Sequence, residues 1–140
     1  MQLRIKQDCA GVDWESVTST LRCVGMAYFD AATHRKAFEG SYSTIFVYHA
    51  DQLIGFGRAI SDGVYQAAVY DCAVLPEFQG QGIGRLIMEE ILSQIPQCNV
   101  VLYASPGKEA FYEKHGFRKM KTGMARFIKA DKMSENGFTK

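Results

Sequence analysis

A glycine-rich segment between a strand-like and a helix-like stretch has the composition of a phosphate-binding turn. It reads Gln79-Gly80-Gln81-Gly82-Ile83-Gly84-Arg85, with three glycines in five residues. Glycine permits left-handed backbone conformations, and the unpaired N–H groups at a helix N-terminus favour an anion. A Walker loop requires Gly-Lys-Ser/Thr, and a dinucleotide fingerprint requires glycine or alanine where Arg85 or Ile87 stands, so the residues match neither nucleotide motif. The alternative is a tight turn that only begins a helix.

The flanks of this segment carry a family resemblance. Residues 71–84 (DCAVLPEFQGQGIG) resemble the acetyl-CoA-binding motif of the GCN5-related N-acetyltransferase (GNAT) superfamily. The core of that motif, Gln/Arg-x-x-Gly-x-Gly/Ala, is met by Gln79, Gly82 and Gly84. Residues 111–117 (FYEKHGF) match a second signature of the family. The chain resembles a small single-domain member of bacterial type, and the resemblance covers essentially its whole length.

The resemblance implies direct transfer of the acetyl group of acetyl-CoA to a primary amine. Backbone amides of the glycine-rich segment would hold the pyrophosphate of CoA, while Arg85, Lys108 or Lys114 would meet its 3′-phosphate. The pantetheine arm would lie where the strand that ends at Val74 splays from the next strand. The cofactor-binding residues implied in this way are Ala73, Val74, Gln79, Gly80, Gln81, Gly82, Ile83, Gly84, Arg85, Ser105 and Phe111. Ser105 departs from the pattern, because family members often carry asparagine there.

The resemblance also supplies catalytic candidates. The backbone N–H of Val74 would stabilise the oxyanion, and a preorganised donor of this kind contributes about 3–4 kcal/mol. Tyr112 would protonate the departing CoA thiolate, since a phenol with a pKa of about 10 is protonated at neutral pH. Asp71, three residues before Val74, is a candidate general base, or equally a structural group that bonds to neighbouring backbone. His115 fits a helix C-terminus better than a base, and Cys72 fits a small buried residue better than a nucleophile.

The acceptor and the class of protein stay open at this stage. Aromatic and acidic residues on the N-terminal helices and around Asp62-Gly63 suit an amine on an apolar body, and they equally describe ordinary core packing. A small amine, an amino sugar, an amino acid or a peptide terminus are all compatible acceptors. The alternative from another class is a non-catalytic acyl-CoA-binding sensor, and a third is a nucleotide-binding regulator. Homodimers are common among such small acetyltransferases, but no residue pattern locates an interface.

Periodicity predicts the elements that must position these residues. Helices are expected where apolar residues recur at three and four, and strands where β-branched and aromatic residues alternate or cluster. The expected helices are 13–24, 31–38, 82–95 and 108–115, and the expected strands are 3–7, 43–49, 53–60, 64–74, 98–103, 117–120 and 122–128. Strand 98–103 is almost continuously apolar, which predicts burial on both faces. These elements, with the resemblance, imply an α+β fold: a central, twisted, mostly antiparallel sheet of six or seven strands with helices on both faces.

Composition narrows the remaining classes. The length of 140 residues fits one domain, for which we predict 1–129 with a polar, mobile tail at 130–140. The net charge of +1 is not that of a nucleic-acid-binding protein. The four cysteines and three histidines show no Cys-x-x-Cys or His-Glu-x-x-His spacing, so we expect no metal and a reduced, cytoplasmic setting. No apolar run approaches the ~20 residues of a membrane span, so we expect no membrane partner.

Overall fold

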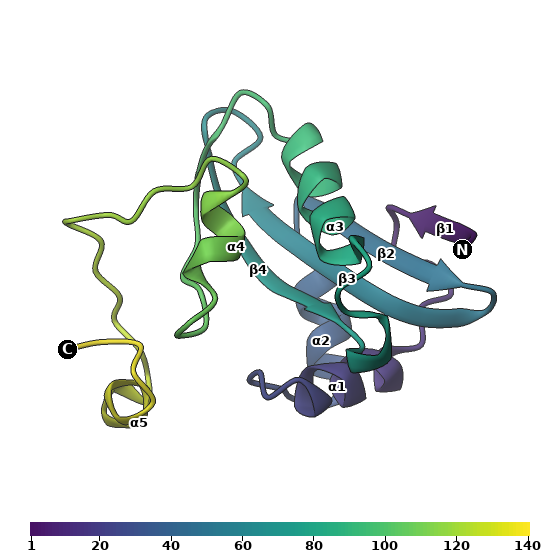
Figure 1. Ribbon diagram of the computed structural model, residues 1–140, viewed down its shortest axis with the longest axis horizontal. Helices are drawn as coiled ribbons and strands as arrows, with labels where there is room; N and C mark the ends of the chain where they lie inside the picture. Colours follow the sequence, from purple (N-terminus) through teal and green to yellow (C-terminus); the bar gives the residue numbers. More distant parts are fainter. The chain divides into compact units, whose positions relative to one another are not determined.

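The computed structural model describes residues 1–140, which form two compact units, Met1–Leu102 and Tyr103–Lys140 (Figure 1). No helix has the length and apolar character needed to cross a membrane. The first unit contains β1 (Leu3–Lys6), α1 (Trp14–Cys23), α2 (Ala31–Glu39), β2 (Ser43–His49), β3 (Gln52–Ser61), β4 (Gln66–Val74), a short 3-10 helix (Pro76–Phe78), α3 (Ile83–Ser93) and β5 (Asn99–Val101). The second contains α4 (Glu109–Glu113) and α5 (Ala130–Glu135).

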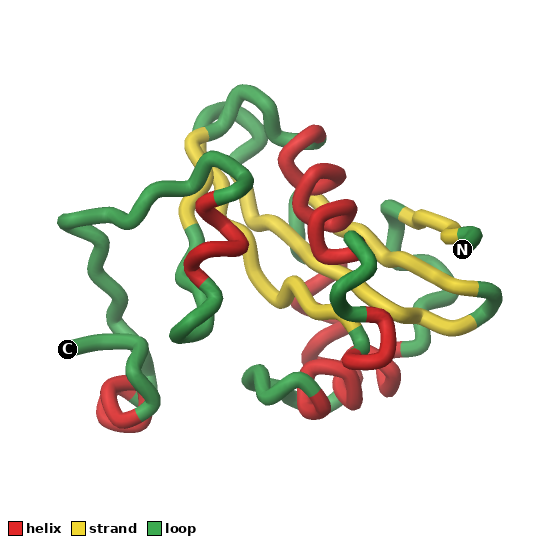
Figure 2. Tube along the Cα trace, in the orientation of Figure 1, coloured by secondary structure: helices red, strands yellow, loops and turns green.

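The first unit is built on one sheet of five strands in the order β1-β2-β3-β4-β5. The first three pairings are antiparallel and the pairing of β4 with β5 is parallel. Helix α3 lies on one face of the sheet, and α1 and α2 lie on the other (Figures 1 and 2). The predicted fold class, a mostly antiparallel α+β sheet covered by helices on both faces, is therefore confirmed.

The N-terminal helices begin where the sequence predicts them. The carboxylate of Asp13 accepts hydrogen bonds from the N–H groups of Glu15 and Ser16, so it caps α1. The apolar stripe of this helix places Val17 and Leu21 in the core, both fully buried. Asp30 caps α2 in the same way through the N–H of Thr33. Both helices then pack on an aromatic layer formed by Trp14, Phe38, Phe46 and Phe56.

Helix α3 approaches β3 closely because glycine stands under it. A Cβ built on Gly57 would lie 2.8 Å from the Cys72 sulfur and 2.9 Å from Ile91 Cδ1. A Cβ on Gly55 would lie 3.0 Å from Ile87 Cδ1. The buried isoleucines of α3 therefore fill the space that side chains at these two glycines would occupy.

The two strands predicted near the C-terminus are wrong. The expected strands 117–120 and 122–128 are not strands, so the sheet has five strands rather than six or seven. In the structure Met124 and Ile128 are about fully exposed. Alternating apolar residues give a segment the capacity to form a strand, but a strand forms only when a partner supplies the ladder. The tail at 130–140 contains the helix α5, and both its mobility and the domain boundary at 129 stay predictions.

The expected strand 98–103 is also shorter and more exposed than predicted. Its ladder covers only Asn99–Val101, and Val101 is 47% exposed. The apolar run led to the expectation of a central strand, but β5 ends the sheet of the first unit and so has a neighbour on one side only.

We expect Gly57→Ala to lower the free energy of unfolding by about 1–3 kcal/mol, because the new methyl group must displace Cys72 or Ile91 in a packed layer. Chemical denaturation of the variant measures this loss. Gly123→Ala is the matched control, since a Cβ there meets only the flexible side chain of Met120, at 3.3 Å. Equal stability of the two variants would contradict the close packing at Gly57.

Candidate active site

The glycine-rich segment forms an open turn that leads into α3. Gly80 and Gly82 adopt φ angles of +78° and +85°, and a Cβ at either would meet nothing within 4 Å. Gly82 is the N-cap of α3, and its carbonyl accepts the hydrogen bond of Leu86 N–H at 3.0 Å. The N–H groups of residues 83–85 therefore precede the helical ladder and point out of the helix end. A bare, N–H-rich surface of this kind can accept an anionic group such as a phosphate.

Side chains of the segment tie the turn to the rest of the first unit. Gln79 Nε2 donates to the Val74 carbonyl at 2.9 Å, and Gln81 Nε2 donates to the Glu77 carbonyl at 3.3 Å. Arg85 is exposed and pairs with Glu89, one helical turn later, at 2.7 Å. The first contact links the glycine-rich turn directly to the end of β4.

The backbone at the end of β4 faces an edge of the sheet that lacks a partner strand. Val74 lies opposite Gly55 on β3, and the next residue, Leu75, donates its N–H to the Ile54 carbonyl at 2.9 Å. Because neighbouring residues of a strand point their N–H groups to opposite sides, the N–H of Val74 points away from β3. The ladder between β4 and β5 covers only residues 66–68 of β4, so it does not reach Val74. The Val74 amide therefore has no strand partner on the side away from β3, while the splay between β4 and the segment after β5 stays a prediction.

A β-bulge interrupts β4 just before this point. Phe56 pairs with Ala73 and Arg58 pairs with Tyr70, so Asp71 and Cys72 together lie opposite Gly57. Asp71 takes the left-handed conformation, with a φ of +56°. Its Oδ2 accepts a hydrogen bond from Arg58 Nε at 2.8 Å, in a partly buried ion pair. Asp71 therefore has the partner that a structural role would require, but this partner is the side chain of Arg58 rather than neighbouring backbone. The role of Asp71 as a general base stays a prediction.

The neighbouring thiol and imidazole are shielded groups. Burial raises the pKa of the Cys72 thiol to about 12, and its sulfur packs over Gly57. A protonated thiol is a poor nucleophile, and the half-buried Cys72 packs against Gly57, in keeping with a packing role rather than that of a nucleophile. Burial also lowers the pKa of His34, whose Nε2 accepts the N–H of Phe29 at 2.8 Å. Sequence reasoning missed this contact, which anchors the loop between α1 and α2.

The second unit holds the other predicted site residues. Phe111 and Tyr112 are half-buried neighbours on α4, with ring centroids 5.1 Å apart and edge to face. The ring centroids of Tyr112 and Phe117 are 6.0 Å apart. Gly116 follows the end of α4 with a φ of +87°, as the sequence predicts for a helix C-terminus. Ser105 begins the turn that leads to α4, its carbonyl accepting the N–H of Lys108 at 2.9 Å.

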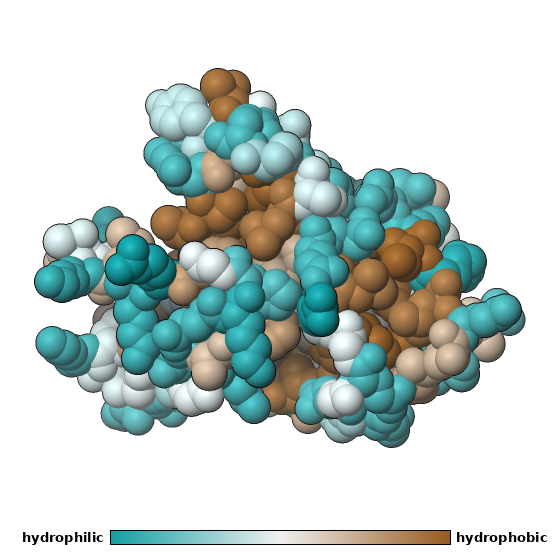
Figure 3. Space-filling view, turned by 45° about the horizontal axis from the view of Figure 1, so that its top comes forward, coloured by the Kyte–Doolittle hydropathy of each residue, from teal (hydrophilic) through white to brown (hydrophobic).

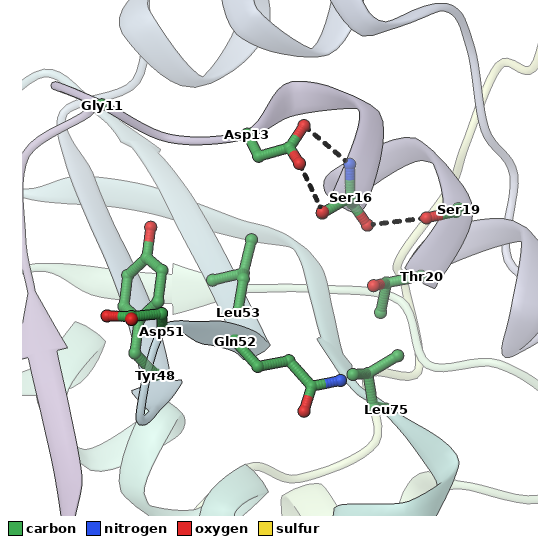
Figure 4. Close-up of a pocket in the computed structure, with 10 residues that line it drawn as sticks. All are labelled: Gly11, Asp13, Ser16, Ser19, Thr20, Tyr48, Asp51, Gln52, Leu53 and Leu75. Carbon is green, nitrogen blue, oxygen red and sulfur yellow. Dashed lines mark hydrogen bonds between the residues drawn. The ribbon is translucent and has the colours of Figure 1, made fainter.

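A cleft of about 300 Å³ in the first unit contains none of the predicted site residues (Figure 4). It lies between α1 and the turn that joins β2 to β3, with Leu75 at one side. Its polar groups serve the local fold: Asp13 binds the amide and hydroxyl of Ser16, and the Ser19 hydroxyl donates to the Ser16 carbonyl. These bonds belong to the cap and first turns of α1, and the other polar side chains that line the cleft are Thr20, Tyr48, Asp51 and Gln52.

Aromatic side chains are exposed on the first unit. The surface in Figure 3 is a mosaic of polar and apolar residues. Tyr28 and Phe29 lie in the loop between α1 and α2, while Tyr42 and Tyr65 flank the hairpin that joins β3 to β4, and each of these four is about half exposed or more. Phe38, by contrast, is fully buried. Core packing therefore accounts for Phe38 but not for these four rings.

Comparison with known proteins gives a consistent result. The profile of the family described as "Acetyltransferase (GNAT) domain" matches residues 15–132. The solved structure of a probable acetyltransferase from meticillin-resistant Staphylococcus aureus is 28% identical, with a TM-score of 0.80 over 91% of this chain and 99% of that chain.

Two curated relatives align with this chain over only part of their own length. An uncharacterized N-acetyltransferase of Porphyra purpurea is 37% identical over 76 residues, which are 52% of this chain and 44% of the relative. Serotonin N-acetyltransferase 2, chloroplastic, of Oryza sativa is 31% identical over 120 residues, or 81% of this chain and 60% of the relative. The chain thus spans less than two thirds of the length of these relatives. The profile match and the S. aureus structure show that this chain is a member of the GNAT family of N-acetyltransferases.

Proposed function

We propose that the chain transfers the acetyl group of acetyl-CoA directly to a primary amine. The observation that carries this proposal is the outward-facing amide of Val74. The carbonyl of the same residue is bound by Gln79, the first residue of the glycine-rich turn 79–85. The turn binds the CoA phosphates through backbone N–H groups, and the pantetheine arm runs along the edge of β4 past Ala73. The proposal extends the family's shared chemistry to particular residues of this chain.

In the proposed reaction the neutral amine attacks the thioester carbonyl. The C–N bond forms, and the carbonyl oxygen gains negative charge that the Val74 N–H stabilises. The C–S bond then breaks and the departing thiolate takes the proton of the Tyr112 hydroxyl. The amine nitrogen loses one proton to solvent, and water returns one to Tyr112, so protons and charge balance. Cys72, whose thiol has a pKa raised to about 12, takes no part, in keeping with direct transfer.

The acceptor we propose is a small amine with an apolar body. The four exposed rings of the first unit, Tyr28, Phe29, Tyr42 and Tyr65, suit an aromatic or cationic acceptor. Because the relative from Oryza sativa is named a serotonin N-acetyltransferase, arylalkylamines are the first acceptors that we would test. That relative is named chloroplastic, whereas the cytoplasmic setting we propose for this chain follows only from its cysteine pattern.

An amine panel tests the proposed function. Thiol release from acetyl-CoA is followed with serotonin, tryptamine, an amino sugar, free amino acids and a peptide with a free N-terminus, and we expect release with at least one arylalkylamine. Thermal denaturation with CoA, ATP and NAD is measured in parallel. Protection by CoA without release of thiol by any amine would instead identify a sensor, and protection by ATP or NAD alone would identify a nucleotide-binding regulator.

Replacing Gly82 by alanine tests the phosphate turn. We expect CoA affinity to fall roughly tenfold, or about 1.4 kcal/mol, because the alanine methyl strains a left-handed residue and projects into the open turn. Isothermal titration calorimetry with CoA measures the loss. Gly25→Ala is the matched control, since Gly25 has a φ of +79° and equally open surroundings outside the turn. Equal CoA affinity of the two variants would contradict a specific role of Gly82 in binding the phosphates.

Replacing Tyr112 by phenylalanine tests the proton donor. We expect kcat to fall about tenfold to a hundredfold, as is typical when a general acid is removed, with little change in CoA affinity. Tyr103→Phe is the control, because Tyr103 belongs to the same unit and packs on Phe127 and Phe138. A normal kcat in Tyr112→Phe, or loss of CoA binding by a folded variant, would exclude the proposed role.

A further inference from the structure

A charged pair holds the residue at which β4 departs from regular strand geometry. Asp71 is one of two residues other than glycine with a positive φ, and side chains disfavour that conformation. Such a residue persists only where its surroundings determine it. The contact that determines Asp71 is the bond of its carboxylate to Arg58 Nε at 2.8 Å, with side-chain exposures of 22% and 15%.

Arg58 is itself fixed from several directions. Its Nη1 donates to the Ser41 hydroxyl at 3.3 Å, and that hydroxyl donates to the Ala37 carbonyl at 2.8 Å. Its guanidinium lies 5.7 Å from the Phe38 ring centroid and 5.5 Å from that of Tyr70. Groups from α2, the loop after it, and β4 therefore set the position of one planar side chain on β3.

The bulge decides which way the Val74 amide points. On the N-terminal side of the bulge, Asp62 donates its N–H to the Gln66 carbonyl, and this hydrogen-bonded register continues to the pair of Arg58 and Tyr70. Continued without an extra residue, the same register would place Val74 opposite Ile54 in a hydrogen-bonded pair. The extra residue instead gives that place to Leu75, which donates to Ile54, and turns the Val74 N–H to the free edge.

We propose that Arg58 is a positioning residue for acetyl transfer. By holding Asp71 in the left-handed conformation it maintains the bulge, and the bulge keeps the Val74 N–H directed at the thioester carbonyl. Asp71 serves in this arrangement as the partner of Arg58 and not as a proton acceptor. The inference rests on the proposed function, because it gives the Val74 amide its catalytic task.

Arg58→Met tests the positioning role by separating turnover from cofactor binding. We expect kcat to fall at least about tenfold, because misdirecting an oxyanion donor should cost part of the roughly hundredfold to thousandfold lost when such a donor is removed, while CoA affinity changes less than about threefold. The phosphate turn is untouched by the change, and CoA has no acetyl carbonyl to meet the Val74 amide. Arg35→Met is the control, because Arg35 forms an exposed pair with Glu39 on α2. Normal kcat in Arg58→Met, or a parallel loss of CoA affinity, would overturn the proposal.

Variants of Asp71 separate the positioning role from that of a base. Asparagine adopts the left-handed conformation readily and can accept from Arg58 Nε, so Asp71→Asn should lose clearly less kcat than Asp71→Ala and should keep the shape of the pH–rate profile. Asp71→Ala loses both properties and should match Arg58→Met, and the double variant should fall no further. If Asp71→Asn is as impaired as Asp71→Ala and loses the acidic limb of its pH–rate profile, Asp71 is a base and the proposal is wrong.

A backbone measurement distinguishes failure of this inference from failure of the proposed function. If no amine releases thiol with the wild-type chain, the proposed function is wrong, and NMR of the Asp71 and Val74 amides then tests the clamp by itself. We expect both chemical shifts and the Val74 exchange rate to change in Arg58→Met and Asp71→Ala, and to be preserved in Asp71→Asn and Arg35→Met. Unchanged signals in Arg58→Met would show that Arg58 does not hold the bulge.

Discussion

One extra residue in β4 is the constraint on which the candidate site depends. Opposite Gly57 the strand places both Asp71 and Cys72, and every residue beyond them is shifted by one in its pairing with β3. A shift of one residue exchanges the groups that point to β3 with those that point away. The Val74 amide and carbonyl both face the free edge for this reason, and the carbonyl is bound there by Gln79. The bulge therefore connects the acetyl-bearing end of the proposed site to the phosphate turn.

Glycine makes this arrangement possible in two physically different ways. At Gly55 and Gly57 the missing side chain leaves room for the isoleucines of α3 and for Cys72, so the helix can lie directly on the bulged strands. At Gly80 and Gly82 there is ample room for a side chain, and the backbone conformation is what requires glycine. The first pair brings α3 close to the sheet, and the second pair directs the chain into that helix with its N–H groups exposed. The close approach of α3 to the sheet and the exposure of the N–H groups in the turn thus have separate causes.

Local patterns predicted much of the first unit and little of what depends on pairing between distant residues. The helices expected at 13–24 and 31–38 depend on contacts between neighbours in the sequence, and the structure confirms both, with Asp13 and Asp30 as their caps. The helix α3 likewise begins after Gly82, as its apolar spacing indicates. Strands 117–120 and 122–128 were predicted from alternation alone, but a ladder needs a partner that alternation does not supply.

Within the candidate site, too, contiguous motifs could be predicted from the sequence and contacts between distant residues could not. A motif match identified the segment from Gln79 to Arg85, because its residue types and spacing are contiguous. The bulge at Asp71 and Cys72, by contrast, involves the contact of Asp71 with Arg58, which lies thirteen residues away in the sequence. No local pattern marks that arginine. An unexplained arginine on the strand paired with the motif strand would have been the only signal.

The choice of aspartate rather than glycine at position 71 follows from what the bulge must do. Glycine would adopt a φ of +56° without strain, but it would also adopt many other conformations at no greater cost. Aspartate is strained there, and in that conformation its carboxylate forms the ion pair with Arg58 that accompanies the strain. A partly buried ion pair adds little net stability, since desolvation offsets much of its attraction. Its effect is to favour one backbone geometry over the alternatives, which is what a directed hydrogen-bond donor at Val74 requires.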